Sequence, residues 1–311
     1  MKKEYILFID SGTGGLSTLS EVYKRISANF IYYADNKNCP YGSHSRKEIL
    51  GFLKNILDEM FNKYEIFMVV LACNTATTSS IDKLRKLYPD KIFIGTEPAI
   101  KLANSLGYKK ILVLSTPATA KQKKYRQLRS KLQTRIQNLC IVDFAENIEL
   151  WLTERASRNN FEQNKSTKTL SKTASICHMK GLPKVSCGQN LGTDFCSAEL
   201  GTENFQLEFS SNILSRTKLI KNLYQIKSKS KNFDCIVLGC THYLLIEELI
   251  RGFASKPLIS GNFGVAKQIE KFLNSNHPPD SKNLITFKFS KHLKGIEENY
   301  KKIFMQILAN Q

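Results

Sequence analysis

Two cysteines follow closely similar runs of apolar residues and are the first candidates for chemistry. Cys73 comes directly after the stretch VVLA at 69–72, and Cys240 after IVLG at 236–239, and hydroxyl or amide side chains follow both. Such a run is typical of a buried parallel strand that gives way to a loop and a helix. Each thiol would then lie at the carboxyl end of a strand, where open α/β sheets bind ligands, and near a helix start, whose dipole favours the thiolate. The sequence therefore predicts two copies of one thiol site.

Each of these cysteines also has a structural interpretation, because free cysteines are among the most buried residues and usually act as small apolar groups. The repeated setting argues against that interpretation for the pair. The chain has eight cysteines, with no Cys-x-x-Cys pair and no zinc-like spacing to its five histidines, so we predict no metal site. In a cytosolic chain the cysteines are expected to be free thiols, which is the state that a catalytic pair requires.

Length and composition predict a globular protein with more than one domain. The chain has 311 residues, of which 42% are apolar, and this is enough to build two domains with cores of their own. It lacks the run of about 18 apolar residues that a transmembrane helix needs. The apolar stretch 5–9 near the start is too short for a signal peptide and ends at Asp10. We therefore expect a cytoplasmic protein that does not insert into a membrane.

The formal net charge of +19 is large, and part of it is concentrated in one stretch, 121–135. The basic residues there are Lys121, Lys123, Lys124, Arg126, Arg129, Lys131 and Arg135. A basic helix can bind nucleic acid or an acidic membrane surface, or it can be a solvated face that speeds the capture of a small anionic substrate. Tyr125 is the only aromatic residue in the stretch and no nucleic-acid motif is present, so we favour the solvated face. A basic nucleic-acid-binding protein is the alternative from another functional class.

Strands and helices alternate along the chain, which predicts an α/β protein with a mostly parallel sheet in each half. The expected strands are 5–9, 30–34, 69–71, 91–95, 110–114, 139–144, 236–238 and 284–289. The expected helices are 16–26, 46–63, 78–87, 121–135, 146–152, 213–226, 265–273 and 296–308.

Two further stretches need an interpretation. The glycine-rich turn 10–15 after the first strand, with Asp35 after the second, suggests a dinucleotide fingerprint, but the third glycine of that motif is missing and we disfavour it. The stretch 157–212 is rich in Ser, Lys, Thr, Asn and Gly and has no sustained period. It buries too little apolar surface to offset the entropy of ordering, so we expect an inserted, mobile segment of unknown role.

Five short motifs in order carry a resemblance to a known family. They are DSGTGG at 10–15, NCPYGS at 38–43, ACNTAT at 72–77, TPAT at 116–119 and GCTHY at 239–243. Together they resemble the glutamate racemases of the aspartate/glutamate racemase superfamily, over nearly the whole chain except 157–212. The resemblance implies two doubly wound, mostly parallel-sheet α/β domains with pseudo-twofold similarity, facing across a cleft with one cysteine from each. It also implies a reaction without a cofactor, whose product, D-glutamate, is used for bacterial peptidoglycan and so for cell-wall shape.

We expect the first domain to comprise 1–97 and about 262–311 and to carry Cys73. The second would comprise about 98–261, carry Cys240 and contain the insert 157–212.

Racemisation removes the Cα hydrogen from one face and returns a proton to the other, so it needs two acid/base groups on opposite sides, and these must share one proton.

Helpers for the two thiols are also expected. A helix terminus contributes about 0.3 to 1 kcal/mol, which is less than the 1.36 kcal/mol of one pKa unit, so on its own it leaves most of the thiol protonated at neutral pH. By resemblance the helpers are Asp10 for Cys73 and His242 for Cys240, with an acid near residue 149 assisting. The sequence leaves open whether Glu146 or Glu149 takes that place.

The resemblance also places the substrate glutamate. Asp10, Ser11 and His242 would lie near its ammonium group, and Asn74, Thr75 and Thr241 near its α-carboxylate. The loop of Pro40, Tyr41, Gly42 and Ser43, together with Thr119, would meet the side-chain carboxylate. Several of these residues could equally be helix caps or turn residues.

The chain departs from the family pattern at several positions. Leu244 replaces a usual proline, Gln122 stands where a serine is common, and the stretch 260–262 (SGN) replaces a common acidic start. The segment 140–149 also differs from the usual apolar, proline-containing stretch before the assisting glutamate. An aspartate racemase of the same superfamily is the nearest alternative enzyme. A homodimer is compatible with the sequence.

Overall fold

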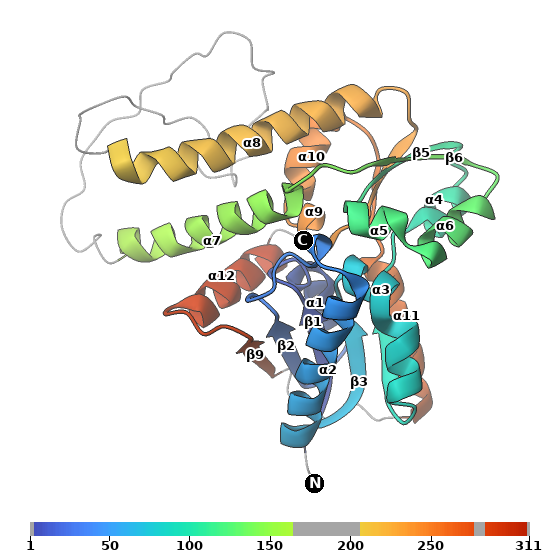
Figure 1. Cartoon of the computed structure of the whole chain (residues 1–311), viewed down its shortest axis with the longest axis vertical. Helices are drawn as coiled ribbons and strands as arrows, with labels where there is room; N and C mark the ends of the chain where they lie inside the picture. Colours follow the sequence, from blue (N-terminus) through green and yellow to red (C-terminus); the bar gives the residue numbers. More distant parts are fainter. Residues whose placement is uncertain (1–2, 164–205, 277–283, 310–311) are drawn as a thin grey trace.

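Two separate parallel sheets form the framework of the chain. The computed structural model describes residues 3–163, 206–276 and 284–309 (Figure 1). The first sheet has five strands in the order β4-β3-β1-β2-β9, and the second has four in the order β6-β5-β7-β8. All neighbouring strands in both sheets pair in parallel. The predicted fold class, a two-sheet α/β protein, is therefore confirmed.

Most of the N-terminal elements and the C-terminal elements belong to the first sheet. Its strands are β1 (Glu4–Asp10), β2 (Phe30–Ala34), β3 (Glu65–Leu71), β4 (Ile92–Gly95) and β9 (Ile285–Phe289). The helices along it are α1 (Leu16–Tyr23), the short 3-10 helix η1 (Tyr41–Ser43), α2 (Arg46–Lys63), α3 (Asn74–Leu87), α11 (Asn262–Asn276) and α12 (Ile296–Ala309). Both α11 and α12 pack on α1, and β9 pairs with β2. The last part of the chain thus returns to the first sheet.

The middle of the chain builds the second sheet. Its strands are β5 (Lys110–Leu114), β6 (Arg135–Leu139), β7 (Cys235–Leu238) and β8 (Leu258–Ile259). The helices are α4 (Ile100–Ser105), α5 (Pro117–Lys121), α6 (Lys123–Ser130), α7 (Phe144–Gln163), α8 (Gln206–Ser230), α9 (Thr241–Leu244) and α10 (Glu247–Ala254). The domain boundaries at 97/98 and 261/262 stay a prediction.

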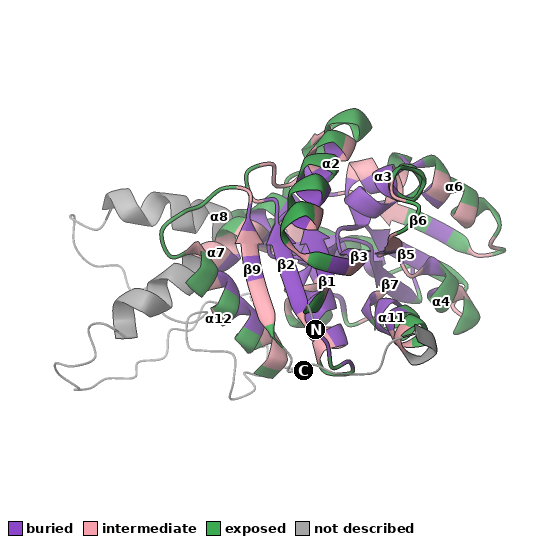
Figure 2. Cartoon of the chain, turned by 90° about the horizontal axis from the view of Figure 1, so that it is seen from below, coloured by how far each residue is buried: buried purple, intermediate pink, exposed green. Residues whose placement is uncertain are grey.

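Side chains on both faces of the first sheet are buried, as expected for parallel strands. Along β1, Ile6 and Phe8 point into one apolar cluster and Leu7 and Ile9 into another on the opposite face. The cluster with Ile6 and Phe8 also takes in Leu112 and other residues of the second sheet. One continuous core therefore joins the two sheets, and Figure 2 shows the buried residues concentrated along their strands.

One expected strand is wrong in position. The strand predicted at 139–144 lies at β6, and the chain enters α7 at Phe144. As the edge strand, β6 alternates buried Ile136 with exposed neighbours and so lacks the apolar run on which the prediction relied. Phe144 instead packs its ring on Tyr243, with the ring centroids 4.8 Å apart.

The helices α7 and α8 lie side by side and extend into both ends of the stretch predicted as an insert (Figure 1). The expected helix near 213–226 is thus longer and begins at Gln206. The rest of that stretch, 164–205, lies outside the described residues. Among the helices that the structure describes, none combines the length and the apolar character needed to cross a membrane.

Candidate active site

Cys73 and Cys240 occupy matched positions in the two sheets. Each is the residue directly before a helix, α3 or α9, and each has an extended backbone (φ −83°, ψ 123° and φ −143°, ψ 135°). Each is 7% exposed. The strands before them, β3 and β7, each pair with the strand that begins its sheet, β1 or β5. The predicted strand–cysteine–helix pattern is confirmed at both positions.

Burial dominates the electrostatics of Cys73. It raises the pKa of this thiol to about 12, the negative charge of Asp10 acts in the same direction, and the N–H of Ala76 in the first turn of α3 opposes them. The predicted preference for thiolate at the helix start is therefore outweighed here. Charge on Cys240 also raises the pKa of Cys73, so the two sulfur atoms are close enough to influence each other.

Asp10 connects the two sheets at the end of β1. Its Oδ1 accepts a hydrogen bond from the N–H of Gly12 at 2.8 Å, and its Oδ2 accepts one from the hydroxyl of Thr241 at 3.1 Å. Burial raises the pKa of Asp10, and the charge of His242 acts against this rise. Because Thr241 begins α9, the hydrogen bond joins the Cys73 side of the site to the Cys240 side.

His242 lies between Cys240 and an acid. Its Nδ1 is 4.0 Å from the Cys240 Sγ, and its Nε2 is 2.8 Å from Oε2 of Glu149. The side chain is buried, at 2% exposure for the residue. Residues two apart do not face each other on a helix, but Cys240 precedes α9 in an extended conformation, which lets both side chains reach one region.

The surroundings of His242 favour its charged form. Burial by itself lowers the pKa of this imidazole, but hydrogen bonds to Cys240, Cys39 and Glu149 and the charge of Glu149 raise it well above its ordinary value. The same contacts act on the acid. Burial by itself raises the pKa of Glu149, but the hydrogen bond and charge of His242 and the hydrogen bonds from Thr13 lower it overall. The two side chains form a buried ion pair.

The two candidates for the assisting acid differ in position. Glu149 faces His242, whereas Glu146, one turn earlier on α7, is exposed. Further donors hold the Glu149 carboxylate: the backbone N–H and the hydroxyl of Thr13, and the hydroxyl of Tyr300 at 3.2 Å. This carboxylate is therefore fixed by groups from both ends of the chain.

The glycines of the 10–15 turn are explained by close approach. A Cβ on Gly12 would lie 2.8 Å from Oε2 of Glu149 and 2.9 Å from the Cys39 Sγ. A Cβ on Gly14 would lie 2.5 Å from Oγ1 of Thr241 and 2.8 Å from Nδ1 of His242. Only a residue without a side chain fits at either position. The turn therefore lets the two halves of the site approach each other closely.

Cys39 is a site neighbour that the sequence did not single out. Its Sγ, a carboxylate oxygen of Glu149 and a ring nitrogen of His242 all lie within 4.8 Å of one another. Burial raises the pKa of the Cys39 thiol to about 11. Its place in the NCPYGS motif is the only signal the sequence holds.

Three threonine hydroxyls meet next to α3. The Oγ1 of Thr75 lies 3.0 Å from that of Thr116 and 3.2 Å from that of Thr119. A Cβ on Gly42 would lie 3.5 Å from Thr116, so the η1 loop borders the cluster. The structure thus places Thr75, which was predicted near the α-carboxylate, next to Gly42 and Thr119, which were predicted near the side-chain carboxylate. Thr116, which caps α5, was missed because a Thr-Pro pair is an ordinary helix start.

The remaining predicted residues differ in how far they are buried and in their hydrogen-bond partners. Ser11 is buried beside Asp10, and the Asn74 side chain donates a hydrogen bond to the Thr96 carbonyl at 3.4 Å. The buried Tyr41 donates its hydroxyl to Asp35 at 2.7 Å, so that hydroxyl already has a partner. Pro40 is half-buried and accepts a hydrogen bond from the exposed Ser43.

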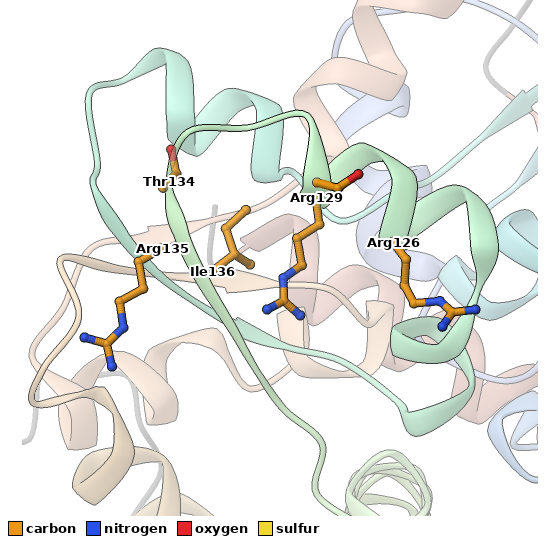
Figure 3. A pocket seen from close by; sticks show the side chains of 6 residues that line it. Arg126, Arg129, Thr134, Arg135 and Ile136 are labelled. Atoms are coloured by element: carbon orange, nitrogen blue, oxygen red, sulfur yellow. The ribbon is translucent and has the colours of Figure 1, made fainter.

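The basic stretch lies away from this site, on and beside α6. Arg126, Arg129 and Arg135 border a shallow pocket of about 420 Å³, but Figure 3 shows their guanidinium groups spread apart and not converging on one point. Lys124 instead pairs with Glu97 at 3.0 Å and Asp82 at 3.6 Å. These arrangements fit the predicted solvated face.

Comparison with known proteins adds an independent line of evidence. No family model matches the chain. It is 35% identical to a glutamate racemase of Clostridium novyi (strain NT) over 225 residues, which cover 69% of this chain and 83% of that relative. It is 30% identical to one of Clostridium botulinum (strain Kyoto / Type A2) over 274 residues, 86% of this chain and 84% of the relative. Among solved structures, Escherichia coli glutamate racemase in complex with L-glutamate and the activator UDP-MurNAc-ala has a similar fold, with a TM-score of 0.66 at 23% identity, covering 98% of this chain and 95% of that one.

The two parallel sheets, each with a cysteine at the end of a central strand, define an amino-acid racemase of the α/β type. Sequence identity narrows the class further. The chain belongs to the glutamate racemase family.

Proposed function

We propose that the chain interconverts L- and D-glutamate without a cofactor, by moving a proton between Cys73 and Cys240 through the substrate Cα. The observation that carries the proposal is the matched placement of the two cysteines before α3 and α9, joined by the Asp10–Thr241 hydrogen bond. A thiolate on one side takes the Cα hydrogen as a proton. The electron pair of the broken Cα–H bond stays on the substrate, which becomes a carbanion. The thiol on the other side then donates its proton to the opposite face.

The Cys73 side depends on the substrate's own charge. With a pKa raised to about 12, the thiol is protonated at neutral pH. A substrate ammonium placed against the Asp10 carboxylate would compensate the negative charge that raises this pKa, and opposite charges at close range favour the ionised form. Asp10 therefore serves as a positioning residue for the ammonium and tunes Cys73.

The Cys240 side depends on a fixed partner. An imidazolium at His242, held by Glu149 at 2.8 Å, places a positive charge beside Cys240, whose Sγ lies 4.0 Å from Nδ1. When Cys240 donates its proton to the substrate, the same imidazolium stabilises the thiolate that forms. Different groups thus act on the charge of the two thiols. Both thiols must be able to take up and donate a proton, because both enantiomers of the substrate react.

The carboxylates of glutamate are assigned to hydrogen-bond donors. The first backbone N–H groups of α3, with Asn74, Thr75 and Thr241, suit the α-carboxylate, because a helix start attracts anions. The Thr116 and Thr119 hydroxyls suit the side-chain carboxylate, next to the loop of Pro40, Gly42 and Ser43. As a small anionic substrate, glutamate is also attracted by the net charge of +19.

The experiment is an exchange assay in D₂O with L-glutamate or L-aspartate, following deuterium at Cα and optical rotation. Glutamate should acquire Cα deuterium and lose optical rotation, and aspartate should react at least about tenfold more slowly. Faster turnover of aspartate would assign the chain to the alternative enzyme. Absence of exchange with both would contradict the proposal. A cytoplasmic location, a role in supplying D-glutamate for peptidoglycan and a homodimer stay predictions.

A further inference from the structure

A cluster of chemical groups lies beside Cys240 and contains one member, Cys39, that has no role in the proton transfer proposed above. It consists of Cys39 after β2, Glu149 on α7 and His242 on α9, with one donor atom from each within 4.8 Å of the others. The three residues are far apart in the sequence. Their spacing therefore gave no sign of a shared site, and only the fold brings them together.

The donor set suits Zn²⁺ and not Mg²⁺ or Ca²⁺. A thiolate, an imidazole and a carboxylate are the ligands that Zn²⁺ takes in proteins, whereas Mg²⁺ and Ca²⁺ require oxygen donors. Tetrahedral zinc, with Zn–S at about 2.3 Å and Zn–N at about 2.0 Å, separates its ligand atoms by about 3.3 to 3.6 Å. The present spacing, 2.8 Å between the His242 and Glu149 atoms and up to 4.8 Å within the cluster, brackets that range. Side-chain movements of roughly an ångström would complete the site.

The surroundings support a metal in this place. Thr13 and Tyr300 donate hydrogen bonds to Glu149 and so hold its carboxylate in position, as the outer shell of a metal site does. The absence of a side chain on Gly12 leaves room for the sulfur and the carboxylate to approach each other. Cys39 is half-buried and the Glu149 side chain is 15% exposed, which gives an ion and a fourth, water ligand a route from solvent.

We propose that Cys39, Glu149 and His242 bind Zn²⁺, and that the bound ion inhibits the racemase. Binding is an exchange of protons for metal: Zn²⁺ replaces the thiol proton of Cys39 and the Nε2 proton of His242, and both are released to solvent. The inhibition rests on the proposed function, because it follows from the role of His242. The binding of Zn²⁺ itself does not depend on that function.

Two effects of the ion explain the inhibition. A metal on Nε2 displaces the proton of that nitrogen and so breaks the His242–Glu149 ion pair on which the Cys240 side of the reaction depends. The ion also ties the loop after β2, in the first sheet, to α7 and α9 of the second half. Any movement of the two halves that admits or releases substrate is then restrained.

Binding is tested directly on the full chain with Co²⁺ as a spectroscopic probe for the zinc site, and with Zn²⁺ in competition with a chromogenic chelator. The wild-type protein should bind one tightly held ion and show a thiolate-to-cobalt charge-transfer band. Cys39→Ser should lose the band and weaken zinc binding about 100-fold. The matched control is Cys140→Ser, another half-buried cysteine, whose Sγ lies near Ser115 outside the cluster, and it should behave like the wild type.

Activity gives the second measurement. Zn²⁺ should inhibit the wild type and Cys140→Ser at concentrations where Mg²⁺ has no effect, and added chelator should restore turnover. Cys39→Ser, or Cys39→Ala if the serine variant folds poorly, should racemise without added metal and resist zinc at least tenfold better. Equal inhibition of all variants, with the cobalt band kept in Cys39→Ser, would place the metal on the catalytic thiols and overturn the proposal. A wild type that binds cobalt through Cys39 but racemises nothing would instead contradict the proposed function alone.

Discussion

At the scale of single residues, His242 and Glu149 form the ion pair on which the chemistry of the Cys240 side depends most. Their 2.8 Å contact is shielded from solvent on the His242 side and only partly on the Glu149 side, and each shifts the pKa of the other toward the charged form. Removing one partner of such a pair leaves the other charge without compensation in a low-dielectric interior. The pair should therefore matter for stability as well as for the Cys240 side of the reaction.

The first prediction concerns Glu149→Gln. We expect it to lower the free energy of unfolding by about 3 kcal/mol near pH 6, measured by urea denaturation. The pKa of Glu149 is lowered, so its contribution is present above about pH 4.3 and is lost as the pH falls through the lowered pKa. The pKa of His242 is raised, so its contribution is complete below about pH 6.5 and is lost as the pH rises through the raised pKa.

The difference between wild type and Glu149→Gln should therefore be largest between about pH 4.3 and 6.5 and shrink on both sides. The control is Glu146→Gln on the same helix, which removes an exposed carboxylate and should change stability by no more than about 0.5 kcal/mol. A difference that does not depend on pH would contradict the ion pair.

At the residue scale the sequence predicted the two cysteines but could not choose between Glu146 and Glu149. That choice depends on the direction in which α7 presents each carboxylate, and α7 begins at Phe144, whose ring packs on Tyr243. Cys39 was missed for a similar reason. Its partners Glu149 and His242 are distant in the chain, and no local pattern reports such a contact.

The elements that build the site are the strand ends, the helix starts and the glycine turn after β1. The apolar runs of β1, β3, β5 and β7 predicted their strands well, because buried parallel strands need continuous apolar sequence. Edge strand β6 was misplaced because one-sided burial leaves only a weak alternation. The turn at 10–15 was open to a nucleotide-binding interpretation until the contacts of Gly12 and Gly14 were known.

The second prediction tests that turn. Gly14→Ala should lower turnover by at least about 100-fold, because its Cβ would lie 2.5 Å from Thr241 and 2.8 Å from His242 and must displace them. Gly51→Ala in the middle of α2 is the matched control, since a Cβ there meets nothing within 4 Å. It should leave activity unchanged and stabilise the protein by about 0.5 to 1 kcal/mol. Normal turnover by Gly14→Ala would show that the turn does not hold the two halves of the site together.

The described part of the molecule consists of two sheets, with the helices around them, that share one core and one site. The core cluster of Ile6 and Phe8 continues into the second sheet, and the Asp10–Thr241 hydrogen bond joins the two sheets where their strands end. The sequence predicted two parallel sheets from alternation alone. It could not predict how closely they approach, because that depends on single residues such as Gly14, whose positions follow no period.

The third prediction concerns the net charge of +19. The guanidinium groups of the basic stretch are spread apart, so we expect no tight binding of duplex DNA or RNA at moderate salt, measured by fluorescence anisotropy across a salt series. The nucleic-acid alternative predicts tight binding with a steep salt dependence. Such binding, weakened by neutralising Arg126, Arg129 and Arg135 together, would favour the alternative.

The central claim is that two thiols on opposite faces of Cα share one proton, and single-cysteine variants assayed in D₂O test it most directly. Cys73→Ser and Cys240→Ser should each lower racemisation of both glutamate enantiomers by at least about 10³-fold, because each direction needs both a base and an acid. Unchanged circular dichroism would show that both variants fold. Full racemisation by either variant would contradict the account.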